Sequence, residues 1–251
     1  MKLIANETAY ARKCLEQNYI DKKQPYKSIR TVIRYLNRVC HINNIDDIYS
    51  AILSYIDSTG RKVKVDKDIV RTMMNEDNPY NDLQHVFISK KEIDTIKSFN
   101  YPHSWNKVLF TMLVHYKTKL AIYPEAKNKR IDADLSIIMN DAHVTLGVQK
   151  RMEMLTKFEE DGLIELPNGG KQAQYIYLYY VDDSIEQVEI VVEDFFDFYL
   201  YYEQYVKGGR LIRCNECCRL ALVKETKTKP VKYCKQCAKV VKNRQCYLSR
   251  K

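Results

Sequence analysis

The chain has 251 residues, 45% of them hydrophobic, and a formal net charge of +9, so it has room for one large or two to three small domains with a real core. No apolar stretch approaches the roughly 20 residues that a membrane-spanning helix needs, which excludes that class of protein. The chain opens with MKLIANETAY, which lacks the apolar core and cleavage site of an export signal. We therefore expect a cytoplasmic protein without membrane contacts.

The positive charge is concentrated at the C-terminal end. Residues 207–251 contain 14 Lys/Arg and 2 Asp/Glu, a balance of +12, whereas the first 206 residues hold the other 27 basic and 30 acidic residues, a balance of −3. A strong positive field on a small segment is typical of proteins that contact a phosphate backbone. A solvated basic tail that only aids solubility is the alternative.

The first 80 residues are predicted to form an N-terminal helical domain (1–80). Apolar residues recur at helical spacing from Ile29 to Val39 and again from Ile45 to Ile56, with Asn44 as the N-cap of the second helix. A break at residues 75–81 suggests a domain boundary near residue 80.

Residues 81–181 are predicted to form a winged-helix domain. It opens with a short strand at 86–88 and a helix through Phe99, which a capping box of Ser89 and Glu92 begins. A strongly apolar helix is then expected from Asn106 to Leu120.

The second half of this domain carries a helix-turn-helix pattern followed by a β-hairpin. We expect a short helix at 135–139, a longer helix at 146–160, a strand at 163–166, a loop at 168–170 and a return strand at 175–180. In a winged helix, the helix after the turn normally enters the major groove, because the groove is wide enough for one helix.

Residues near the start of the longer helix are the candidates for DNA contact. We expect Val148, Met152, Leu155 and Phe158 to form its buried face, so residues on other faces should be free to meet DNA. The candidates are Thr145, Gln149, Lys150 and Arg151 in or just before this helix, for bases and phosphates, and Lys171 in the wing, for a phosphate. Because several Glu residues also lie in the helix, a winged helix that contacts only protein is the alternative.

Residues 182–206 form an acidic segment with many aromatic side chains. It holds eight Asp/Glu and seven Phe/Tyr, and no Lys or Arg occurs from Gln172 to Val206. We predict an acidic aromatic helix that packs its rings inward and leaves its carboxylates in solvent. The segment could also dock a basic protein partner or shield the basic tail of the same chain.

Four cysteines near the C-terminus form two C-x2-C pairs sixteen residues apart, namely Cys214, Cys217, Cys234 and Cys237. Two such turns supply the four thiolates of a closed tetrahedral site, so we predict one structural Zn²⁺ without a catalytic role. Two disulfides are the alternative, which the missing export signal disfavours. Cys218 could compete as a ligand.

The basic zinc-binding module spans residues 207–251. Lys207, Gly208 and Gly209 are expected to form a hinge, followed by a hairpin with strands at 220–223 and 231–233 and a helix opened by the second cysteine pair. That order is typical of a treble clef or short zinc ribbon. The candidates for phosphate contact on the helix are Lys239, Lys242 and Arg244.

The enzyme classes that leave a sequence signature are not represented. All five histidines precede the cysteine motif, and the phosphate-binding loop G-x-x-x-x-G-K-[ST] and the nucleophile elbow G-x-S-x-G are both missing. We therefore expect a protein without enzymatic activity.

Four stretches, FISKKEIDTI, LFTMLVHYKTK, RMEMLTKFEEDGLIEL and the cysteine-containing tail, together resemble winged-helix proteins with a C-terminal zinc knuckle from phages and mobile elements of low-GC Gram-positive bacteria. The resemblance covers about two thirds of the chain and leaves the first 80 residues unexplained. It implies a fold that is mainly α with small β-hairpins, in the cytoplasm of a bacterial cell or of a phage host.

The function that this resemblance implies is double-stranded DNA binding in transcription regulation or replication initiation. The alternative, from a different class, is a protein-interaction factor that modulates a host complex such as a polymerase or a defence nuclease through the acidic aromatic segment and the cysteine knuckle, without DNA.

Overall fold

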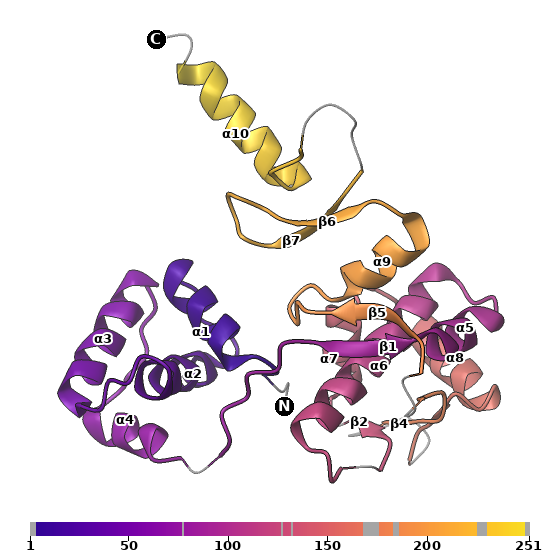
Figure 1. Ribbon diagram of the computed structural model, residues 1–251, viewed down its shortest axis with the longest axis horizontal. Helices are drawn as coiled ribbons and strands as arrows, with labels where there is room; N and C mark the ends of the chain where they lie inside the picture. The colour runs from indigo at the N-terminus through magenta and orange to yellow at the C-terminus, as the bar shows by residue number, and fades with distance from the viewer. Residues whose placement is uncertain are drawn as a thin grey trace. The chain divides into compact units, whose positions relative to one another are not determined.

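The computed structural model describes residues 4–76, 78–126, 128–131, 133–167, 176–182, 186–224 and 230–248 (Figure 1). The described chain is mainly helical and contains small antiparallel sheets, as predicted for the fold class. It divides into two compact units, one ending at Gln84 and the other beginning at His85. None of the helices in the described ranges is long and apolar enough to cross a membrane.

The N-terminal unit contains four helices, α1 (Glu7–Glu16), α2 (Pro25–Arg38), α3 (Ile45–Ser58) and α4 (Lys67–Met74). The predicted helices correspond to α2 and α3, whose residues Ile29, Ile48 and Ile52 are fully buried. Asn44 caps α3 as predicted, because its side chain accepts a hydrogen bond from the Asp46 backbone N–H at 2.8 Å. The helices α1 and α4 have no counterpart in the prediction.

A buried arginine fixes the end of this unit. Arg34 of α2 is 1% exposed and forms an ion pair with Glu7 of α1 at 2.8 Å. It also donates to the carbonyl oxygens of Asn78 and Pro79 at 3.1 and 2.8 Å. The guanidinium therefore holds the irregular segment near residue 80 against α1 and α2. The ion pair and the two hydrogen bonds offset the free-energy cost of burying its charge.

The second unit, up to the cysteine motif, contains β1 (Val86–Ser89), α5 (Lys90–Ser98), α6 (His103–Ile122), β2 (Arg130–Ile131), α7 (Leu135–Asp141), α8 (Val148–Glu160), β3 (Ile164–Glu165), β4 (Ile176–Leu178), β5 (Val188–Val192) and α9 (Tyr199–Lys207). The capping box is present, with both Ser89 and Glu92 side chains bonded to the opposite backbone N–H. Twelve of the twenty residues of α6 are buried, so this helix forms the centre of the unit.

The strands β2, β4 and β3 form a three-stranded antiparallel sheet in that order. Ile131 pairs with Ile176, and Ile164 pairs with Leu178, so buried side chains from three separate segments meet on one face. The predicted hairpin loop at 168–170 and the wing candidate Lys171 lie outside the described residues.

The predicted helix over residues 182–206 is wrong for its first half. Val188–Val192 is a strand, β5, which pairs antiparallel with β1 and aligns Val191 with Phe87. From Glu189 to Val192 the side chains of this strand are alternately exposed and buried, a pattern that suits a half-buried strand. Only the part from Tyr199 to Lys207 is the predicted aromatic helix, α9.

The C-terminal part, which we call the cysteine module, runs from Arg210 to Leu248 and contains β6 (Arg210–Arg213), β7 (Leu220–Val223) and α10 (Lys235–Leu248) (Figure 1). The predicted hairpin paired a strand at 220–223 with one at 231–233, and this pairing is wrong. The strand β7 pairs with β6 instead, and residues 231–233 form no strand. The cysteine turn joins β6 directly to β7, so those two strands are the nearest available partners.

The expected hinge at residues 207–209 is a tight turn. Gly208 and Gly209 have φ values of 69° and 96°, a region that favours glycine. A Cβ atom on Gly209 would lie 2.7 Å from the backbone oxygen of Val223 in β7. The second glycine is therefore needed for close packing of the chain against β7.

Candidate metal centre and nucleic-acid surfaces

The four motif cysteines converge on one point. Cys214 follows β6, Cys217 lies in the turn before β7, Cys234 precedes α10 and Cys237 lies in its first turn. Their sulfur atoms all lie within 4.8 Å of one another, and the Sγ atoms of Cys217 and Cys234 are 4.0 Å apart. Tetrahedral coordination with metal–sulfur bonds near 2.3 Å requires separations of about 3.8 Å. The predicted ligand set is thus positioned for a four-coordinate metal ion.

Backbone hydrogen bonds hold the two cysteine pairs in place. The Cys218 N–H donates to the Cys214 carbonyl at 2.8 Å, and Cys218 has a φ of 55°, which tightens the first turn. The Asn215 N–H donates to the Lys232 carbonyl at 2.9 Å and so joins the two halves of the site. Cys218 itself is exposed and is not part of the sulfur cluster.

The thiol groups differ in acidity. Burial opposes ionisation of Cys214, but backbone N–H groups of Cys217, Cys234 and Glu216 lower its pKa to about 6. Burial raises the pKa of Cys217, and the neighbouring Cys234 sulfur raises that of Cys237. The Cys214 thiolate is therefore favoured at neutral pH, whereas a bound cation would favour ionisation of Cys217 and Cys237 as well.

Two ion pairs attach the cysteine module to the segment between β5 and α9. Arg213 contacts Asp194 at 3.0 Å, and Arg219 contacts Asp197 at 2.7 Å. The aspartate side chains are only 4% and 7% exposed. These carboxylates, which sequence analysis places in a solvated acidic face, instead bind arginines that flank the first cysteine pair.

A third acidic residue, Glu203 of α9, is also engaged within the unit. It accepts from His103 at 3.0 Å, forms an ion pair with Lys107 at 3.2 Å and contacts Lys207. Burial would raise its pKa, but the hydrogen bonds from Lys207, His103 and Lys107 lower it to about 2. Three acidic residues of the acidic aromatic segment, Asp194, Asp197 and Glu203, thus help to hold α9 and the cysteine module in place.

The DNA-contact candidates of α8 are accessible. Thr145, Gln149 and Lys150 are exposed, whereas Arg151 is partly buried and donates to the Leu146 carbonyl at 3.4 Å. The Nε atom of Arg151 is buried without a hydrogen-bond partner.

The predicted buried face of α8 is wrong at its N-terminal end. Val148 is 75% and Met152 37% exposed, whereas Leu155 and Phe158 are buried as expected. Phe158 packs against Tyr101, with ring centroids 5.2 Å apart. The core therefore covers only the C-terminal half of α8, and the N-terminal half extends beyond it.

The candidates on α10 are exposed, but one of them has a partner. Lys239 and Lys242 lie in solvent, and Arg244 forms an ion pair with Glu216 at 3.1 Å. Glu216 lies in the cysteine turn, so this pair joins the helix to the first half of the metal site.

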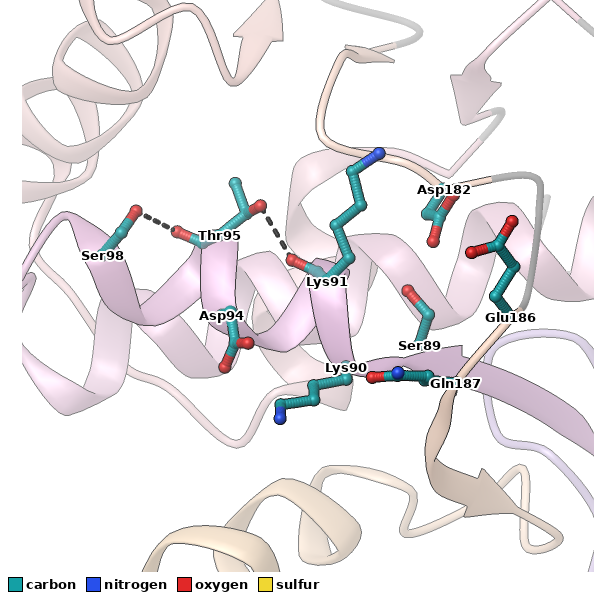
Figure 2. Close-up of a pocket in the computed structure, with 9 residues that line it drawn as sticks. All are labelled: Ser89, Lys90, Lys91, Asp94, Thr95, Ser98, Asp182, Glu186 and Gln187. Atoms are coloured by element: carbon teal, nitrogen blue, oxygen red, sulfur yellow. Dashed lines mark hydrogen bonds between the residues drawn. The ribbon is translucent and has the colours of Figure 1, made fainter.

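A depression of about 700 Å³ beside α5 is a second place where a ligand could bind, apart from the cysteine cluster and α8 (Figure 2). Figure 2 shows that its hydroxyl groups are used locally: Thr95 donates to the Lys91 carbonyl and Ser98 to the Thr95 carbonyl, both at 2.8 Å. The Ser89 hydroxyl accepts from the Glu92 N–H. The three hydroxyl groups of the described lining are therefore bonded to backbone groups rather than to a base that could activate them.

Sequence reasoning missed the two arginine–aspartate pairs, because no local pattern indicates a contact between an acidic segment and a cysteine turn some twenty residues later. It also missed a group of basic residues in two loops of the N-terminal unit, which their density in sequence could have indicated; they are Lys22, Lys23, Arg61, Lys62 and Lys64. No protein-family model, curated protein or solved structure matches this chain, so its function must be inferred from its own residues.

Proposed function

We propose that this protein is a non-enzymatic, double-stranded DNA-binding factor that regulates transcription or initiates replication. The elements α6, β2, α7, α8, β3 and β4 follow the order of a winged helix, with α7 and α8 as the helix-turn-helix. The sheet order β2-β4-β3 supports this assignment, since the strand before the helix-turn-helix joins the hairpin that follows it.

The observation that carries the proposal is the exposed N-terminal half of α8. A helix that served only the core would bury Val148, yet this side chain is 75% exposed beside the polar residues Gln149 and Lys150. An amide and an ammonium group on such a surface can read base edges, and an exposed apolar side chain can contact a thymine methyl group. This combination suits a recognition helix.

We further propose that the cysteine cluster binds one structural Zn²⁺ in a treble-clef-like or zinc-ribbon module. Four thiolates and no open position are typical of such sites. The metal would fix the start of α10, leaving Lys239 and Lys242 free for phosphate contact. The zinc supplies folding energy in such a module, and it takes no part in chemistry.

The alternative, a protein-interaction factor that needs no DNA, depends on a free acidic surface. Asp194, Asp197 and Glu203 are instead bound to basic groups of the same chain. Their engagement leaves less acidic surface for a partner and favours the DNA-binding proposal.

The proposal is tested by selecting bound duplexes from a random library with the full-length, zinc-loaded protein and measuring affinity by fluorescence anisotropy. Gln149→Ala with Lys150→Ala should weaken the selected duplex at least tenfold, because a good base contact contributes about 1–3 kcal/mol. The matched control changes Thr156 and Lys157 to alanine at the other end of the same helix. Equal affinities for the two double variants, or no duplex selected by the native protein, would contradict the proposal.

A further inference from the structure

Two loops of the N-terminal unit meet around a hollow of about 440 Å³. One loop connects α1 to α2 and the other follows α3. Three basic residues line the hollow, Lys22 and Lys23 from the first loop and Arg61 from the second. Lys62 and Lys64 continue the second loop and are exposed. The two loops are almost forty residues apart in sequence, and together they carry five basic residues at or next to the hollow.

Side-chain hydrogen bonds hold these loops in defined positions. The Tyr55 hydroxyl donates to the Tyr19 carbonyl at 2.5 Å, and the Ser58 hydroxyl donates to the Asn18 side chain at 2.9 Å. The Tyr26 hydroxyl donates to the Lys64 carbonyl at 2.9 Å. The backbone that carries the cations is therefore ordered before any ligand binds, which lowers the entropic cost of binding.

The charge state of the hollow distinguishes it from the rest of the unit. In the described part of the chain, the five loop cations Lys22, Lys23, Arg61, Lys62 and Lys64 form no ion pair. Other basic side chains of the unit do form them: Arg30 and Arg34 pair with Glu76, Arg34 also with Glu7, Lys67 with Asp46, and Arg71 with Asp68.

The carboxylate in the lining does not neutralise these cations directly. Asp21 accepts hydrogen bonds from the backbone N–H groups of Lys23 and Gln24 at 2.8 and 2.9 Å. The loops thus gather positive charge that no described carboxylate pairs with, whereas several cations of the neighbouring helices are paired, and such a surface favours a polyanion.

Phosphate groups of nucleic acid fit this surface better than an acidic protein does. Protein interfaces normally have an apolar, often aromatic centre. The largest exposed apolar side chain near these loops is Tyr26, at 46%, and its hydroxyl is already bonded to the second loop. Lysines and arginines around a polar hollow match the way proteins contact the DNA backbone, by neutralising phosphates and releasing counterions.

We propose that these loops form a second phosphate-contacting surface, through which the N-terminal unit binds the backbone of the duplex that α8 reads. The inference rests on the proposed DNA binding and assigns the N-terminal unit a part in it. The surface adds affinity without sequence preference, because phosphate contacts carry no base information.

The test measures the dependence of duplex affinity on salt with the full-length, zinc-loaded protein. Lys22→Gln with Arg61→Gln should reduce the slope of log affinity against log salt by about two, since each lost phosphate contact removes about one unit. Lys23→Gln alone should remove about one. Lys67→Gln with Arg71→Gln is the matched control, because it removes two exposed positive charges that are paired within the same unit. The control should keep the native slope.

The outcomes separate this inference from the proposed function. A lower slope for Lys22→Gln with Arg61→Gln, together with an unchanged preference for the selected sequence, supports it. Equal slopes for test and control variants overturn it while leaving recognition by α8 intact. Native duplex affinity combined with lost binding to poly-glutamate would also overturn it and assign the surface to an acidic protein. Absence of duplex binding by the native protein at any salt concentration overturns both proposals.

Discussion

The helices α6 and α10 are held in opposite ways. Twelve of the twenty residues of α6 are buried, whereas no described side chain of α10 is buried and Val240 and Tyr247 are 52% and 63% exposed. The first helix is stabilised by apolar surface removed from water. The second helix has Cys234 and Cys237 of the cysteine cluster at its N-terminal end, and Arg244 in its C-terminal half pairs with Glu216 of the cysteine turn. A short polar helix can thus be positioned without a hydrophobic core.

The helix α9 and the turn before it connect these two regions. Tyr202 packs against Phe110 of α6, with ring centroids 5.4 Å apart, and Glu203 pairs with Lys107. On the other side, Asp194 and Asp197 bind the arginines that flank the first cysteine pair. This one short segment thus contacts both the buried helix α6 and the module that carries the cysteine cluster.

Removing the metal should have the largest effect. Chelation, or Cys237→Ser, should abolish the amide-exchange protection of α10 and leave that of α6 close to native, because structural zinc contributes about 10–16 kcal/mol to the folding of small modules. Hydrogen–deuterium exchange measured by mass spectrometry reports both helices at once. Cys218→Ser is the control and should retain the metal and the protection. Persistent amide-exchange protection of α10 without metal would show that α10, contrary to this expectation, does not depend on a metal ion for its stability.

Acid should next weaken the attachment of α9 to α6. The folded-state pKa of Glu203 is lowered to about 2 from 4.5, so its stabilisation is fully present above about pH 4.5 and is lost as the pH falls towards 2. The shift corresponds to about 3 kcal/mol. Denaturant unfolding at about pH 6 and about pH 3 should show about 2 kcal/mol of this loss in the native protein, since the folded-state carboxyl is still mostly ionised at about pH 3, and a smaller loss in Glu203→Gln. Glu193→Gln, an exposed change nearby, should behave as the native protein.

The smallest effect should come from the pairs that attach the cysteine module. A double-mutant cycle of Asp197→Asn and Arg219→Ala should give a coupling energy of about 1 kcal/mol, because the aspartate is buried but the arginine is half exposed. Global unfolding and amide exchange in β6 and β7 measure it. Additive single effects would show that the pair does not stabilise the contact.

Local signals in the sequence predicted a large part of the fold. Apolar periodicity and capping residues predicted the helices α2, α3, α5 and α8, and the paired spacing of the cysteines predicted which four would cluster. The same kind of signal existed for the missed helices α1 and α4. Their N-caps, Asn6 and Asp66, accept hydrogen bonds from Ala9 and Ile69 at 2.6 and 2.8 Å.

Other features depended on partners far along the chain. The strand β5 pairs with β1 about one hundred residues earlier, and the Asp194–Arg213 contact joins an acidic segment to a basic one. The exposure of Val148 also has no local signal, because its helical position matches that of the buried Leu155. Only the extent of the core decides which of the two is covered.

The sequence by itself thus determined the helical character of the chain, the caps that begin its helices and the four cysteines that meet, because these follow from residues a few positions apart. Tertiary structure alone decided which strands pair, which carboxylates are buried against arginines and which half of α8 is exposed. Each of these depends on contacts whose free energy is gained only when distant segments are brought together.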